Sequence, residues 1–356
     1  MEGEHPVIKG SEIVKNWERV EETVWKKVLP NEMFGDFNPY ALEVEGDWFE
    51  DPCKDYRVHL GDVYINGTSM FEAKSMEDLY DSTPFYNNYP SCFQGSYQLW
   101  NKIEDKTVAN PELTTYKWYA TVDETNTTIF CNFQNYNPNE EFIEINVRPC
   151  CFYPKSTGIN YITLRGFEIA QTASPWAPPT ADQIGMVGPH WSKGWIIENN
   201  ILHDAKCCAV SLGKDEATGH NLSIRYGRKS NHRHQLEAVF SAIQLGWDKD
   251  TVGSHIVKNN EIYDCGQAGV VGHMGCVFSK VEHNHIYNIG LKHEYWGHEM
   301  AGIKFHAAID VVIKNNNIHN CSTFGIWLDW QNQGFKRPYS FYPIPFPPLN
   351  CCSRVL

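Results

Sequence analysis

The second half of the chain repeats one short pattern of apolar and polar positions. Each copy has a β-branched run, then asparagine, then an apolar residue and an aromatic residue or histidine. The copies are GWIIENNILHD (194–204), SHIVKNNEIYD (254–264), SKVEHNHIYN (279–288) and VVIKNNNIHN (311–320), with YITLRGFEIAQ (161–171) as a degenerate member. An equivalent apolar residue recurs at steps of 33, 60, 24 and 32 residues, in Ile169, Leu202, Ile262, Ile286 and Ile318.

This spacing predicts a parallel β-helix. We interpret the step of 60 residues as two turns, so that one turn takes roughly 23–33 residues, and the unit has no helical periodicity. A single coil cannot bury its apolar face alone, and the coils are therefore expected to stack. Asparagines at the corners should then form ladders of hydrogen-bonded amides.

Residues 11–140 lack the asparagine repeat, and apolar and polar positions alternate there instead. TTYKWYATV (114–122) and TTIFCNF (127–133) flank a polar DETN, which predicts an antiparallel hairpin, and DVYINGTSMFEA (62–73) alternates similarly. We expect an all-β fold, a right-handed parallel β-helix with an inserted β-sandwich. The expected parts are a remnant coil at 1–10, the sandwich at 11–140, the β-helix at 141–334, resuming at EEFIEINVR (140–148), and an unrelated proline-rich tail at 335–356.

A second repeat lies on one set of the predicted strands. Three motifs align without gaps, 33 and 23 residues apart, namely AGVVGH (268–273), AGIKFH (301–306) and FGIWLD (324–329). Side chains alternate between the two faces of a strand, so Ile303 and Phe305 are expected to point into the β-helix. Lys304 and His306 then face outward.

Stacking these strands in register predicts a column of polar side chains on the outer surface. The column contains His273, His306 and Asp329, with Lys304 beside Trp327 in the neighbouring column. A carboxylate, two histidines and an indole ring on a rigid sheet suit a sugar, because the ring stacks on the indole and the polar groups bind its hydroxyls. The alternative is a solvated face.

Charge and apolar content exclude some classes of binding partner. The 43 acidic residues outnumber the 30 basic ones, giving a net charge of −13, which argues against nucleic acid as a partner. No run of eighteen apolar residues is present, so no membrane span is expected. MEGEHPVIKG at the N-terminus has neither a basic nor an apolar signal region, which predicts a cytoplasmic location. A homo-oligomer is compatible with the sequence.

No cofactor or metal is expected from the motifs. HEMAG (298–302) begins like a zinc-protease helix but ends in Gly302 instead of a second histidine. No triplet of aspartate and glutamate suggests calcium. The twelve cysteines include no C-x-x-C pair, and we interpret most of them as reduced and buried.

Longer stretches of the chain resemble glycoside hydrolase family 120, from about Val7 to Gly334. The stretches that carry this resemblance are FGDFNPY (34–40), GDW (46–48), EINVR (144–148), YITLRGFEIAQTASPWAPPTADQ (161–183), HWSKGWIIENNILHD (190–204), QLEAVF (235–240), GHEMAGIKFHAAIDV (297–311) and GIWLDWQNQG (325–334). The family consists of β-xylosidases built on a right-handed parallel β-helix that an immunoglobulin-like sandwich interrupts.

The resemblance implies a retaining, exo-acting enzyme that releases xylose from the non-reducing end of xylo-oligosaccharides. Such an enzyme needs a nucleophile and an acid/base, two carboxyl groups about 5–5.5 Å apart. Asp329 occupies the position of the family's nucleophile, and Trp48, His298 and Glu299 occupy positions that hold the substrate. The column described above adds His306, Trp327, Lys304 and His273 as substrate-binding residues.

The sequence departs from the family at both ends. The family has β-helix strands before the VIKG coil, and its acid/base glutamate follows the nucleophile by some twenty-odd residues. No aspartate or glutamate follows Asp329 here. We therefore expect the acid/base to be absent and turnover to be impaired.

Two other functions are compatible with the sequence. A non-catalytic carbohydrate-binding β-helix would keep the sugar cleft and not hydrolyse. A pectin-active lyase would need calcium carboxylates and an arginine or lysine base, and the outer column offers only Lys304 as a base.

Overall fold

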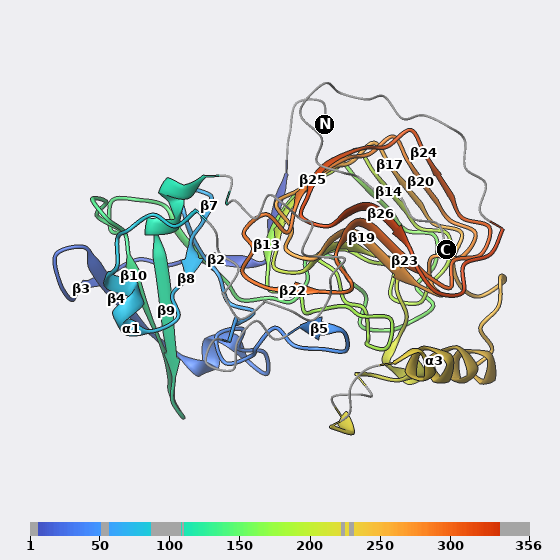
Figure 1. Ribbon diagram of the computed structural model, residues 1–356, viewed down its shortest axis with the longest axis horizontal. Coiled ribbons are helices and arrows are strands. Elements are labelled where there is room, and N and C mark those ends of the chain that lie inside the picture. The colour runs from blue at the N-terminus through green and yellow to red at the C-terminus, as the bar shows by residue number, and fades with distance from the viewer. Residues whose placement is uncertain are drawn as a thin grey trace.

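The computed structural model describes residues 6–50, 57–86, 108, 110–221, 225–227 and 231–334. Parallel strands stack coil upon coil in one body, and a mostly antiparallel body lies beside it (Figure 1). The predicted tail at 335–356 lies outside the described residues. Of the helices in the described part of the chain, none is long and apolar enough to cross a membrane.

Three parallel sheets form the β-helix. The first contains β1 (Val7–Lys9), β13 (Glu168–Thr172), β15 (Ile201–Ala205), β18 (Glu261–Tyr263), β21 (His285–Ile289) and β25 (Asn317–Cys321). The second contains β12 (Thr163–Arg165), β14 (Ile196–Glu198), β17 (Ile256–Lys258), β20 (Lys280–Glu282) and β24 (Val312–Lys314). The third contains β16 (Cys208–Ser211), β19 (Ala268–His273), β23 (Ala301–His306) and β26 (Phe324–Leu328).

The strand register confirms the repeat. The five equivalent apolar residues pair in series across the first sheet, Ile169 with Leu202, then Ile262, Ile286 and Ile318. The first four of these side chains are fully buried in the core of the β-helix. This stacking is what allows each coil to bury an apolar face that it cannot bury alone.

An asparagine ladder runs along one corner of the β-helix, as predicted. The side-chain amide of Asn200 donates to Asn260, that of Asn260 to Asn284, and that of Asn284 to Asn316, each over 3.0 Å. Each amide also donates to a backbone carbonyl, for example from Asn260 to Ile197 over 2.9 Å. The ladder therefore satisfies polar groups that would otherwise be buried without partners.

The step of 60 residues is a single coil and not two, which corrects the expectation. Leu202 pairs directly with Ile262, and the extra residues leave the β-helix. They include a 3-10 turn at Glu216–Thr218 and helix α3 (His232–Gln244), whose N-terminus is capped by Asn231. The helix buries small side chains against the end of the third sheet, so the excursion returns to the same coil.

The other body is a sandwich of two sheets. One contains β3 (Glu18–Arg19), β4 (Val24–Pro30), β10 (Asn126–Asn132), β9 (Lys117–Val122) and β8 (Phe71–Glu72), and it is antiparallel except for the parallel pair of β8 and β9. The other contains β2 (Ser11–Ile13), β11 (Ile143–Asn146), β6 (Val63–Ile65) and β7 (Thr68–Ser69). The predicted hairpin is present as β9 and β10, and the fully buried Trp118 and Ile145 belong to the core between the sheets. A short helix, α1 (Met76–Tyr80), flanks the sandwich.

One predicted boundary is wrong. The β-helix does not resume at 140–148, because β11 pairs antiparallel with β2 and with β6 inside the sandwich. The alternation in EEFIEINVR suits either kind of strand, since a strand of a parallel sheet and one of a sandwich both bury apolar residues. On the other side of the insertion, β1 pairs in parallel with β13 of the β-helix.

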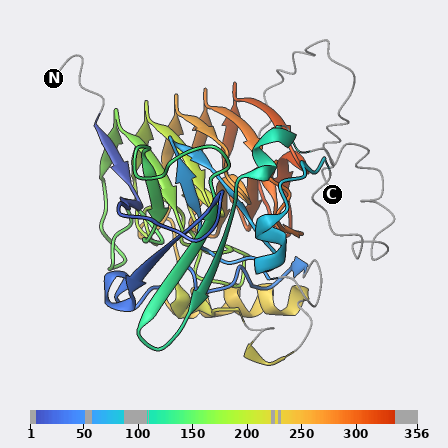
Figure 2. The ribbon, with the colours of Figure 1, turned by 90° about the vertical axis from the view of Figure 1, so that its left-hand side faces the viewer.

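The insertion and the β-helix meet through a strand pair and buried charges. β5 (Phe49–Glu50) of the insertion pairs antiparallel with β22 (Trp296–Gly297), at the lower edge of the β-helix in Figure 1. Nearby, the buried Glu294 of the β-helix accepts a hydrogen bond of 3.3 Å from the backbone N–H of Glu72 in the insertion. Lys206 and Lys292 each lie 3.2 Å from one of the carboxylate oxygens of Glu294. Figure 2 shows the sandwich lying in front of the stacked coils, so its loops border the β-helix surface.

Candidate active site

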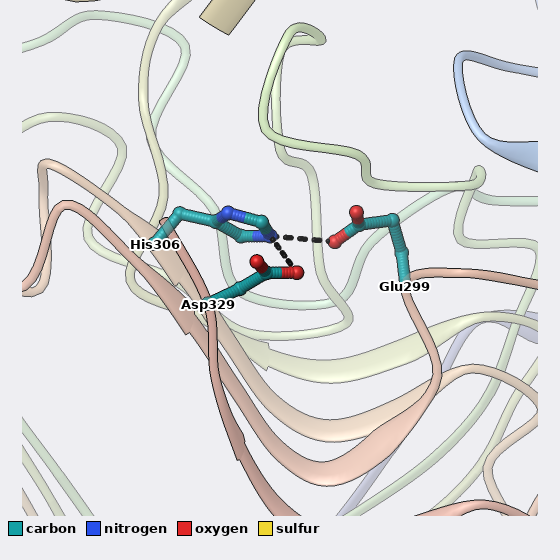
Figure 3. Close-up of side chains that lie close together, drawn as sticks. All are labelled: Glu299, His306 and Asp329. Atoms are coloured by element: carbon teal, nitrogen blue, oxygen red, sulfur yellow. Dashed lines mark hydrogen bonds and ion pairs between the residues drawn. The ribbon is translucent and has the colours of Figure 1, made fainter. Parts of the chain in front are cut away.

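The third sheet and one turn bring the predicted polar residues together. Lys304 and His306 lie on β23, and Asp329 directly follows β26. The backbone N–H of Asp329 donates to the carbonyl of Phe305, which continues the register of the two strands and sets Asp329 beside His306. Glu299 lies in the turn between β22 and β23 and approaches from the other side (Figure 3).

Four of these side chains form one network. Glu299 Oε2 lies 2.8 Å from His306 Nε2 and 3.7 Å from Lys304 Nζ. Asp329 Oδ2 lies 2.7 Å from Lys304 Nζ and 3.9 Å from His306 Nε2. The ammonium of Lys304 also lies 3.3 Å from the ring centroid of Trp327, a cation–π contact. Two carboxylates therefore share two basic groups next to an indole ring.

The column faces out of the β-helix but is covered, which corrects the expectation of an exposed surface. Phe305 lies in the apolar core, whereas Lys304 and His306 point away from it, and both are fully buried. His273 is also fully buried, and its Nδ1 donates to the carbonyl of Pro179. Segments distant in the sequence lie over this face, and the periodicity of the strands carries no signal for them.

His273 lies next to the network of Glu299, Lys304, His306 and Asp329, on the side of His306. Its ring centroid lies 6.0 Å from that of His306, and the two rings meet edge to face. Burial, with His306 and Lys214 nearby, lowers the pKa of His273 well below its usual range, so the imidazole is neutral at pH 7. The side chain of His273 contacts Pro179 and His306 and lies behind His306 as seen from the carboxylates.

Trp48 and His298 come from opposite sides of the junction. Trp48 precedes β5, and its carbonyl accepts a hydrogen bond of 3.0 Å from the backbone N–H of His298, which follows β22. The ring of His298 contacts that of Trp296 at 4.8 Å. Trp48 has φ of 60°, a left-handed conformation that is rare for a bulky residue and is held by surrounding structure.

The charges around Asp329 favour its ionised form. Burial raises the pKa of this carboxyl group, but Lys304 and His306 more than offset the effect, and the net pKa lies below its ordinary value. Oδ1 accepts a hydrogen bond of 2.9 Å from the N–H of Trp330, and Oδ2 is held by Lys304. The side chain remains 21% accessible. The result is a fixed carboxylate that a ligand can reach.

Glu299, His306 and Asp329 are also candidate metal ligands, because one potential ligand atom of each lies within 4.8 Å of the others. The ammonium of Lys304 already supplies a positive charge between the two carboxylates, at 2.7 and 3.7 Å. A divalent cation there would lie against this ammonium. The donor set therefore suits the hydroxyl groups of a polar ligand better than a cation.

Sequence reasoning missed several buried residues that border this site. Asp47, Trp176 and Thr180 are almost completely buried, and the hydroxyl of Thr180 donates to Asp47 Oδ2 over 2.5 Å. All three lie in the stretches GDW (46–48) and YITLRGFEIAQTASPWAPPTADQ (161–183) that resemble the family. That resemblance was the available signal, since neither periodicity nor spacing marks these positions.

Comparisons with known proteins agree with the fold. The family model for the insertion domain of glycoside hydrolase 120 matches residues 14–145, and a model for a right-handed β-helix region matches residues 190–336. A solved structure, the complex of XylC with xylose, is 54% identical and superposes with a TM-score of 0.85. The match covers 93% of this chain and 50% of that one, so this chain spans about half the length of XylC. No curated protein matches the chain.

The fold is that of the right-handed parallel β-helix class, with a sandwich inserted into the β-helix. The matched insertion domain is particular to one group within that class. The chain belongs to glycoside hydrolase family 120.

Proposed function

We propose that this protein is a retaining β-xylosidase that acts on the non-reducing end of xylo-oligosaccharides, with Asp329 as nucleophile. The observation that carries the proposal is the geometry of Asp329, a partly accessible carboxylate held ionised by Lys304 at 2.7 Å. The xylose complex of a protein 54% identical to this chain supports a xylose unit as the ligand.

A glycosidase nucleophile must be ionised and correctly oriented when the sugar arrives. Asp329 meets both needs, because Lys304 and the N–H of Trp330 each hold one carboxylate oxygen. The attack of a carboxylate on the anomeric carbon breaks the glycosidic bond, releases the leaving group as an alcohol and forms a glycosyl-enzyme. Water then hydrolyses this intermediate with retention, which frees xylose and restores the carboxylate. We assign Glu299, His306 and His298 to the sugar hydroxyls, since they lie around the nucleophile or in the adjoining turn.

Trp48 and Trp327 complete the proposed subsite from opposite sides. Trp48 belongs to the insertion and bonds to the turn that carries His298, whereas Trp327 lies on the β-helix under Lys304. An indole provides an apolar surface for a sugar ring. We assign a less direct part to His273, which contacts His306 by its ring and holds no contact with the nucleophile among those described.

The test is hydrolysis of nitrophenyl β-xyloside by the whole chain and by Asp329→Asn. The amide cannot act as nucleophile, so turnover should fall by at least about 10³-fold. Asp264→Asn makes the same change after β18 of the first sheet and should leave turnover unchanged. Equal activity of Asp329→Asn and the unsubstituted chain would refute the assignment of the nucleophile.

A carbohydrate-binding protein without efficient turnover is the second candidate. The other carboxylate that the described residues place at Asp329 is Glu299, and its Oε2 is already bonded to His306 and lies near Lys304. General acid catalysis typically raises the rate of the chemical step by about 10²–10⁴-fold. Without a proton donor, turnover of substrates with a poor leaving group should be lower by a similar factor, and this impairment stays a prediction.

Comparing two substrates separates the candidates. Nitrophenol is a good leaving group that needs little protonation, whereas the sugar leaving group of xylobiose needs a proton donor. Turnover of nitrophenyl xyloside with weak cleavage of xylobiose would indicate that a nucleophile acts without an efficient acid. Rapid cleavage of xylobiose would show that a proton donor is present, and Glu299→Gln would then test whether this residue supplies it.

A further inference from the structure

Trp176 lies where the insertion meets the β-helix and is only 2% exposed. Its ring lies against the backbones of two glycines that are far apart in the sequence. A Cβ atom at Gly297 would lie 2.5 Å from Cζ2 and from Cη2 of the ring, and one at Gly46 would lie still closer to Cδ1. Both distances are shorter than the 3.0 Å that real Cβ atoms keep, so each backbone touches the indole directly.

The two glycines belong to the two segments that carry proposed sugar-binding residues. Gly46 lies two residues before Trp48, in the insertion, and Gly297 directly precedes His298 and Glu299. The ring of Trp176 therefore separates these segments at one edge. At another point they are joined, because the N–H of His298 donates to the carbonyl of Trp48 over 3.0 Å.

Hydrogen bonds fix the orientation of the indole. Nε1 of Trp176 donates to the carbonyl of Asp47 over 3.0 Å, and Asp47 is in turn bonded through its side chain to Thr180 at 2.5 Å. The backbone N–H of Asp47 donates to Oδ1 of Asn221 over 3.1 Å. These bonds hold the residue next to Trp48, whose positive φ needs such support.

Aromatic neighbours prevent the ring from shifting. The ring of Trp176 packs edge to face on those of Phe49 and Tyr295, with distances between ring centroids of 5.4 and 6.0 Å. Phe49 lies on β5 and Tyr295 directly precedes β22, the two strands that pair across the junction. The indole is therefore packed against both segments as well as bonded to one of them.

We propose that Trp176 is a positioning residue, whose ring sets the separation between the segment of Trp48 and the turn of His298 and Glu299, and so the width of the sugar subsite. The inference rests on the proposed function, because that function makes these segments the walls of a xylose subsite. It assigns Trp176 no contact with the sugar.

The test compares two buried tryptophans. Trp176→Phe shortens the ring and removes the bond to Asp47. Trp195→Phe is the matched control, since Trp195 is 1% exposed and its Nε1 also donates to a backbone carbonyl, that of Ile159 at 2.6 Å. Titration with xylose should show a Kd at least about fivefold higher in Trp176→Phe and unchanged in Trp195→Phe. Equal Kd values in the two variants would overturn the proposal.

A second pair of variants tests the contact between the ring and the backbone of Gly297. Gly297→Ala places a Cβ against the indole, whereas a Cβ at Gly325 on β26 would meet its nearest neighbours at 3.5 and 3.9 Å. Neither glycine has a positive φ, so the change adds no backbone strain at either position. Gly297→Ala should weaken binding of xylose and Gly325→Ala should not. The same Kd in both would contradict the role of the ring contact.

A readout without ligand separates this inference from the proposed function. The amide of His298 is protected by its bond to Trp48, and its hydrogen exchange should accelerate at least about tenfold in Trp176→Phe and not in Trp195→Phe. Unchanged exchange in Trp176→Phe would overturn the positioning role. Failure of the unsubstituted chain to bind xylose would refute the proposed function alone, since faster exchange would still show that Trp176 sets the two segments.

Discussion

Replacing Lys304 by methionine removes the one lysine ammonium that the described residues place between Glu299 and Asp329. The side chain is fully buried, and its Nζ lies 2.7 Å from Asp329 Oδ2 and 3.7 Å from Glu299 Oε2. Methionine has a similar length and no charge. The variant therefore leaves two carboxylates close together with His306 as the remaining basic group of the network.

The geometry gives the size of the loss. At an effective dielectric constant of about 20, the attraction is about 6 kcal/mol at the shorter distance and about 4.5 kcal/mol at the longer one. Desolvation of the three charged groups offsets several kcal/mol of this. Removing one partner of a buried ion pair typically destabilises by about 3–5 kcal/mol, and we expect the free energy of unfolding at pH 7 to fall by that amount.

The loss should depend on pH with a defined sign. Burial raises the pKa of Asp329, and Lys304 and His306 lower it below its usual value near 3.8. In the native chain Asp329 thus contributes stability above the unfolded pKa, and this contribution is lost as pH falls through the folded pKa. Without Lys304 the effect of burial is less opposed and the pKa rises. The difference between variant and native chain should therefore shrink below pH 4.

Urea unfolding followed by circular dichroism, at pH 7 and at pH 3.5, measures both effects. Lys314→Met is the control, because Lys314 is 38% exposed and pairs with Glu282 at 3.0 Å on the second sheet. A surface pair contributes about 0–1 kcal/mol, so that variant should change little. If Lys304→Met costs no more than Lys314→Met, or costs the same at both pH values, the reasoning on the buried network is wrong.

Two further variants test the fold. Asn260→Ala interrupts the asparagine ladder and leaves the carbonyl of Ile197 without the amide that now bonds to it. The free energy of unfolding, measured in urea, should therefore fall by about 2–4 kcal/mol. A loss under about 1 kcal/mol would contradict a structural role for the ladder. Glu294→Gln leaves Lys206 buried without its carboxylate and should cost about 3–5 kcal/mol at pH 7. Burial raises the pKa of Glu294, but Lys206 and Lys292 lower it to about 2, so the native chain should lose this stability as the pH falls from 4.5 to 2. Thermal unfolding measured over that range should show no such loss in Glu294→Gln. Melting temperatures that fall in parallel with pH in the two proteins would refute the pairing.

The β-helix was predictable because its sequence signal is local and repeated. Each coil must place an apolar residue inward at the same position, and the series from Ile169 to Ile318 records that requirement. The outward phase of Lys304 and His306 follows from strand alternation alone, once Phe305 is placed inside. A gap-free alignment of three strands was enough to bring Asp329 next to His306.

The cover over the site was not predictable in this way. A strand pattern states which face a side chain takes, but the segment that packs on that face comes from elsewhere in the chain. Pro179 over His273 is one example, and the turn that brings Glu299 to His306 is another. The excursion with α3 escaped the repeat analysis for the same reason, since a long insertion inside one coil has the same length as an additional coil.

The junction between the two bodies explains why the site needs the insertion. The third sheet supplies a rigid row of polar side chains, but an exposed row would hold its charges in water, where ion pairs contribute little. Covering Lys304 and His306 strengthens their hold on Asp329, since the effective dielectric constant falls on burial. The insertion, through the bond from His298 to Trp48 and the packing on Trp176, anchors the turn that carries Glu299. The sandwich therefore holds in place the segment that completes the charge network.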